Sequence, residues 1–99
     1  MKIPKKIKIS GIDYEVKIIE VGEVPPLMSN HADGQTSHDT CKIYLDKALN
    51  KQRMSQIFIH EILHAIEWNN DFESPENYIQ AMASGLYQVL KDNKLLRSE

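Results

Sequence analysis

Several features that would point to particular classes of protein are scarce in this sequence of 99 residues. It contains one cysteine, so no internal disulfide can form. Its 12 Lys and Arg residues are balanced by 14 Asp and Glu residues, without the basic excess typical of a nucleic-acid-binding protein. Apolar runs are too short for a membrane span or for the core of a signal peptide. We therefore expect a cytoplasmic protein that binds neither nucleic acid nor membranes.

The length fits a single domain over residues 1–99, and residues 1–46 are predicted to be rich in β-structure. Isoleucine alternates with lysine over 6–9, and apolar residues alternate with charged ones over 12–18. Ser10-Gly11 separates the two stretches. This alternation on both sides of a turn signal predicts a β-hairpin with one buried face.

A second hairpin is expected after a connecting loop. Glu20–Met28 contains the pair Pro25-Pro26, which interrupts both helix and strand, and it predicts the loop. Gln35–Ser37 could form a short strand, and Cys41–Leu45 alternates again. His38-Asp39 would then form the turn of this hairpin.

The period then changes to that of helices. Asn50 is a plausible N-cap for a helix over about 50–69, which is apolar on most sides and therefore expected to be central to the domain. Ser74-Pro75-Glu76 has the pattern of an N-cap, an N1 proline and a first-turn acid, so a second helix is predicted over about 75–92, followed by a tail at 93–99. One apolar stripe is expected on this second helix, formed by Ile79, Met82, Ala83, Leu86, Val89 and Leu90.

These elements predict an α+β fold, in which a small, mostly antiparallel sheet of two hairpins packs on an antiparallel helical hairpin. Within the first helix lies His60-Glu61-Ile62-Leu63-His64, an H-E-x-x-H motif. Residues four apart on a helix share one face, so both imidazoles can bind one zinc ion (Zn²⁺). Glu61 lies beside the metal, where it can act as the general base for a zinc-bound water.

A catalytic zinc usually has three protein ligands, so a third residue is needed. Glu76 is the first choice, because the antiparallel hairpin places the start of the second helix opposite the His64 end of the first. An ordinary first-turn acid is the alternative interpretation of Glu76. Glu73 is a second candidate ligand. His31 and His38 are weaker candidates for this ligand, because a histidine in a polar segment is more often solvated than bound to metal. Either residue could instead contact substrate or stabilise an oxyanion.

A family resemblance adds to these expectations. Lys42–Leu45, His60–Ala65 and Gly85–Asn93 resemble the corresponding stretches of small zinc peptidase-like proteins encoded by phages and prophages. These are similar to the ImmA/IrrE-type metallopeptidases, within the gluzincin group. The resemblance implies a minimal zincin-like fold and a zinc metallopeptidase. It also implies that His60, His64 and Glu76 bind the metal and that Glu61 is the catalytic base.

The resemblance further implies that an extended substrate peptide pairs with a strand edge, at Cys41–Leu45 or Gln35–Ser37. By analogy with larger relatives, the substrate could be a regulatory protein of a mobile element. Two alternatives stay open at this point. The chain could be a zincin-like module that binds a protein partner and whose zinc is structural or vestigial, or a structural domain without metal.

Overall fold

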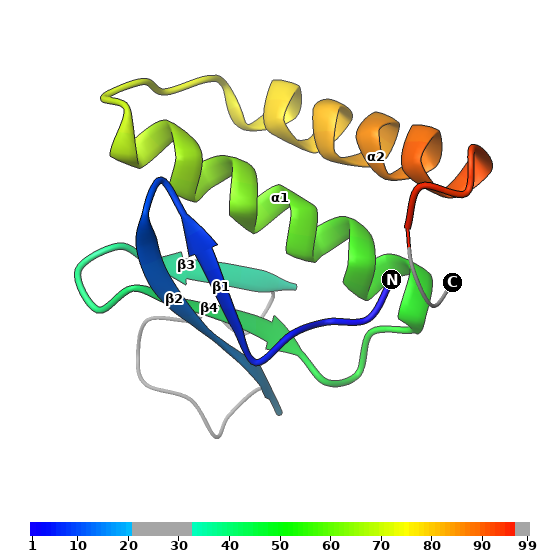
Figure 1. Cartoon of the computed structure of the whole chain (residues 1–99), viewed down its shortest axis with the longest axis horizontal. Coiled ribbons are helices and arrows are strands. Elements are labelled where there is room, and N and C mark those ends of the chain that lie inside the picture. The colour runs from blue at the N-terminus through cyan, green and yellow to red at the C-terminus, as the bar shows by residue number, and fades with distance from the viewer. Residues whose placement is uncertain (21–32, 97–99) are drawn as a thin grey trace.

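The computed structural model describes residues 1–20 and 33–96 of the chain and confirms the expected α+β fold (Figure 1). The elements in chain order are β1 (Lys6–Ile9), β2 (Ile12–Ile19), β3 (Gly34–Ser37), β4 (Lys42–Asp46), α1 (Lys51–Asn69) and α2 (Glu76–Asp92). Over the described residues, neither helix combines the length and the apolar character needed to cross a membrane.

Four strands form one sheet in the order β1-β2-β4-β3. The two predicted hairpins are both present, since β1 pairs with β2 and β3 pairs with β4 in antiparallel fashion. A parallel pairing between β2 and β4 joins them, with Val16 opposite Ile43, so the sheet is mixed. Because β4 is paired on both sides, a peptide could add to β3 but not to Cys41–Leu45, contrary to one of the two expectations.

The hairpin turns explain where the strands end. Ser10 and Gly11 both have positive φ, at 53° and 79°, which suits the twist of a two-residue hairpin loop. Cys41 was expected in a strand, but it has a φ of 53° and ends the turn between β3 and β4. Strand β4 therefore begins one residue later than predicted, at Lys42.

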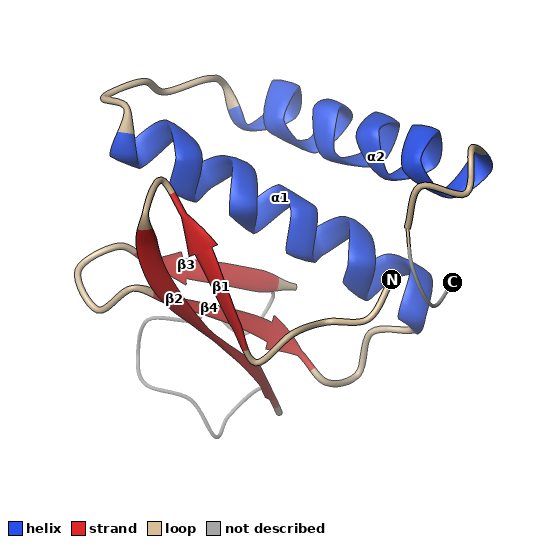
Figure 2. Ribbon diagram, viewed as in Figure 1, coloured by secondary structure: helices blue, strands red, loops and turns tan. Residues whose placement is uncertain are grey.

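Helix α1 lies between the sheet and α2, as its apolar surface predicts (Figure 2). On one side its residues Phe58 and Ala65 share a core with Tyr14, Ile43 and Leu45 of the sheet. On the other side, a smaller cluster lies between the two helices, formed by Ile59, Ala83 and Tyr87. The helix is thus buried on two opposite sides, and polar groups on its remaining surface are confined to a narrow strip.

The second helix differs from its prediction in two respects. Pro75, rather than Ser74, occupies the N-cap position, and the Ser74 hydroxyl instead donates to the Glu67 carboxylate of α1. Of the expected apolar stripe, only part is buried against α1. Met82, Leu86 and Val89 are exposed, since α2 packs on one helix and not on the sheet.

Two glycines offer a matched test of this packing. A Cβ on Gly34 would lie 2.6 Å from Cγ2 of Ile57 and 3.1 Å from the carbonyl oxygen of Tyr44, so β3 approaches α1 too closely for a side chain. We expect Gly34→Ala to lower the free energy of unfolding by about 1–3 kcal/mol through overpacking. A Cβ on Gly85 meets nothing within 4 Å.

Gly85→Ala is therefore expected to raise the free energy of unfolding by about 0.5–1 kcal/mol, because alanine favours a helix interior. Urea denaturation of both variants measures the two effects. A Gly34→Ala protein as stable as wild type would contradict the close approach of β3 to α1.

Candidate metal centre

The two histidines of the motif are positioned by α1. The Asn50 side chain caps this helix by accepting a hydrogen bond of 2.8 Å from the backbone N–H of Arg53, as predicted. From this fixed start, the helical period brings His60 and His64 onto one face. Their Nε2 atoms are 3.1 Å apart, and the rings meet edge to face with centroids separated by 4.8 Å. The two nitrogen atoms thus lie close enough together to bind the same metal ion.

Glu76 reaches these two nitrogen atoms from the start of α2. Its Oε1 atom is 2.7 Å from Nε2 of His60, and its Oε2 atom is 3.1 Å from Nε2 of His64. The connection between the helices is held by Glu67 of α1, whose carboxylate accepts hydrogen bonds from the backbone N–H and the hydroxyl of Ser74. These two hydrogen bonds hold the chain just before α2, and they thereby help to position the backbone of Glu76.

The donor set and its spacing fit zinc. Each of the three residues offers one ligand atom, and these atoms all lie within 4.8 Å of one another. In a tetrahedral site with bonds of about 2.0–2.1 Å, ligand atoms are separated by about 3.3 Å. The observed separations of these ligand atoms are 2.7–3.1 Å, so they would have to increase only slightly to hold a zinc ion. Two imidazoles and one carboxylate are the same donor types as in the His₂Glu set known from three-ligand catalytic zinc sites.

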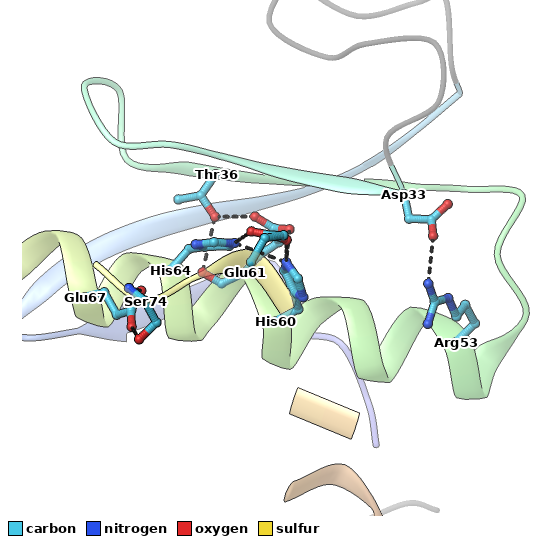
Figure 3. A network of polar contacts seen from close by, with 9 residues as sticks. Asp33, Thr36, Arg53, His60, Glu61, His64, Glu67 and Ser74 are labelled. Atoms are coloured by element: carbon cyan, nitrogen blue, oxygen red, sulfur yellow. Dashed lines mark hydrogen bonds and ion pairs between the residues drawn. The ribbon is translucent and has the colours of Figure 1, made fainter. Parts of the chain in front are cut away.

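Glu61 projects from the adjacent face of α1 and does not join this group. Its side chain is only 7% exposed, and its Oε2 atom lies 4.0 Å from Nε2 of His60. The Thr36 hydroxyl of β3 donates to Oε1 over 2.8 Å and also lies 3.2 Å from the Glu61 carbonyl oxygen. Burial raises the pKa of the Glu61 carboxyl, while the Thr36 hydrogen bond and the neighbouring histidines oppose this effect. The carboxylate is therefore held beside His60 and His64 (Figure 3).

His38 also lies beside this centre, on the turn between β3 and β4. Its ring stacks on that of Trp68, with centroids 4.4 Å apart and planes within 4°. Burial lowers the pKa of its imidazole, and the nearby charge of His64 lowers it further, against the opposing effect of Asp39. Its Nδ1 atom is buried without a hydrogen-bond partner in the described part of the chain.

A cavity of about 460 Å³ opens onto the three candidate ligands and Glu61 together. Its walls come from β3 and from both helices, and include Thr36, His38 and Gln80. At one end Arg53 of α1 forms an ion pair of 3.1 Å with Asp33, which ties the start of β3 to the helix (Figure 3). The cavity is large enough for part of a peptide, and β3 runs along it as an edge strand.

The structure thus groups His60, His64 and Glu76 and places Glu61 next to them, as the spacing predicts. Glu73 does not belong to the donor group. His31 lies outside the described residues. Thr36 was not singled out from the sequence, because the pairing of a partly buried threonine with a carboxylate 25 residues away depends on tertiary structure.

The contact between Thr36 and Glu61 can be tested directly. Thr36→Val keeps the shape of the side chain but removes a hydrogen bond to a charged group, which contributes about 1.5–3 kcal/mol. If Glu61 is a catalytic base, kcat for peptide hydrolysis should fall about tenfold to a hundredfold with KM nearly unchanged. Thr36→Ser should restore most of the rate. Equal kcat for wild type and Thr36→Val would show that Thr36 does not position the base.

Comparisons of the chain with models of protein families, with curated proteins and with solved structures found no match.

Proposed function

We propose that this chain is a zinc-dependent metallopeptidase that cleaves a protein substrate in the cytoplasm. The observation that supports this proposal most is the convergence of Glu76 with His60 and His64, whose ligand atoms lie within 4.8 Å of one another beside a buried glutamate. Three protein ligands leave one coordination position free, which is typical of catalytic rather than structural zinc.

The chemistry follows from these positions. Zinc held by the three side chains would lower the pKa of a water molecule and polarise the scissile carbonyl group. Glu61 accepts the proton of the attacking water and later donates it to the leaving amine. Thr36 holds the Glu61 carboxylate in the orientation required for both transfers. His38 lies at the edge of the cavity, where its ring can contact the substrate.

The substrate is proposed to be an extended segment of a protein. Strand β3 offers a free edge within the described part of the sheet, and it lines the same cavity as His60 and Glu61. A peptide that pairs with such an edge gains main-chain hydrogen bonds, and its side chains alternate between the two faces. A regulatory protein of a mobile element is the candidate substrate suggested by the family resemblance.

The proposal is tested by measuring bound zinc and hydrolysis of a broad peptide library by the purified chain. We expect about one zinc ion per chain and cleavage that stops on chelation and returns when zinc is restored. Stoichiometric zinc without cleavage of any peptide would instead favour a protein-binding module. A chain that takes up no zinc would overturn the proposal.

A further inference from the structure

A second cavity, of about 590 Å³, lies at the end of α1 next to the metal centre. Its aromatic lining comes from Trp68 and Phe72, whose side chains are both exposed. Three carboxylate residues, Glu67, Asp71 and Glu73, line it as well. His38 and His64 complete the lining. We refer to the cavity formed by these seven residues as the acidic pocket.

No lysine or arginine is among the described residues that line the acidic pocket. The pocket also surrounds the C-terminal end of α1, where the helix dipole is negative and where basic side chains are commonly found. The last turn of α1 has no basic residue. Side-chain charge and helix dipole therefore both favour a cation in this pocket.

The aromatic rings of the pocket favour a ligand that has an apolar part as well as a positive charge. A flat indole or phenyl face attracts a cation within about 6 Å of its centroid and also covers the aliphatic stem of a long side chain. One face of the Trp68 indole stacks on the His38 ring. Trp68 is 57% exposed despite that contact. A ligand that carries both a positive charge and an apolar stem would match the pocket better than a metal ion.

The acidic pocket adjoins the proposed active site. His38 and His64 line both cavities, and His64 is one of the three zinc-binding candidates. A substrate whose scissile bond lies at the metal centre would therefore place a neighbouring side chain in the acidic pocket. We propose that this pocket receives a lysine or arginine side chain next to the scissile bond, and so selects basic substrates; this inference rests on the proposed function.

Fluorescence offers a test that needs no cleavage, since Trp68 is the single tryptophan of the chain. The zinc-loaded Glu61→Gln protein is titrated with blocked alanine–serine hexapeptides that carry lysine, arginine, norleucine or glutamate at one central position. We expect the lysine and arginine peptides to perturb Trp68 emission with Kd values about tenfold below that of norleucine. The preference should weaken at about 0.5 M salt.

Matched variants separate the pocket from general charge. In an Asp71→Asn/Glu73→Gln protein, the lysine preference over norleucine should fall to within about threefold, whereas Asp92→Asn at the far end of α2 should preserve it. Equal binding of lysine and norleucine peptides, or a preference that survives the double substitution, would overturn the inference.

Cleavage of the same peptides by the wild-type chain distinguishes the two proposals. Cleavage with no preference for a basic residue would leave the peptidase proposal intact and reject the basic-residue pocket. A lysine preference in Trp68 emission without any cleavage would support the pocket as a site for basic side chains and count against the peptidase.

Discussion

Glu61→Gln is expected to reduce kcat/KM for peptide hydrolysis by about 10³-fold, because the amide cannot accept a proton from the attacking water. Glutamine has the same shape as glutamate and can still accept the Thr36 hydrogen bond through its carbonyl oxygen. Zinc content should stay near one ion per chain, since Glu61 is not part of the donor group. Steady-state kinetics and metal analysis of the same preparation measure both quantities.

A conservative substitution elsewhere controls for nonspecific effects of the change. Glu15→Gln removes a similar charge from an exposed position on β2, where the carboxylate forms an ion pair with Lys17. Its kcat/KM should equal that of the wild type. Hydrolysis by Glu61→Gln at the wild-type rate would exclude Glu61 as the base. Loss of zinc from Glu61→Gln would mean that this residue belongs to the metal site instead.

Zinc is expected to stabilise the wild-type chain strongly, because a ligand that binds only the folded state shifts the folding equilibrium. At free zinc about a thousandfold above Kd, the gain is about 4 kcal/mol. For a domain of this size, that corresponds to a rise in Tm of about 15 °C or more. His64→Ala and Glu76→Gln each remove one donor, so the rise should be largely lost. Thermal unfolding by circular dichroism, with added zinc and with chelator, measures it.

Glu73→Gln is the informative control for this experiment, since Glu73 was the second candidate for the third ligand. Its zinc-dependent rise in Tm should match that of the wild type. If Glu73→Gln loses the rise and Glu76→Gln keeps it, the third ligand is assigned to the wrong residue. A wild-type Tm that zinc and chelator leave unchanged would favour a domain without metal.

Local patterns account for most of what could be predicted here. Alternation around Ser10-Gly11 and the apolar surface of residues 50–69 each reflect contacts that a strand or a helix makes along its own length. The motif in α1 is local in the same sense, because helical geometry alone places His60 and His64 together. The position of Glu76 could also be predicted, because a short connection forces adjacent helices to run antiparallel.

The features that escaped prediction all depend on contacts between distant segments. The parallel pairing of β2 with β4 cannot be predicted from the local sequence, because apolar and polar residues alternate in the same way in parallel and antiparallel strands. Gly34 is required by the proximity of Ile57, and the role of Thr36 depends on Glu61. The exposure of Met82 on α2 follows from which neighbour covers that helix, which apolar spacing cannot specify.

Binding of one zinc ion by His60, His64 and Glu76 can be tested by anomalous diffraction. Data are collected on both sides of the zinc absorption edge from crystals of the wild-type chain grown with zinc. We expect one anomalous peak about 2.0–2.2 Å from Nε2 of each histidine and from a carboxylate oxygen of Glu76. Absence of a peak between these three side chains, or a zinc ion bound there without Glu76, would contradict it.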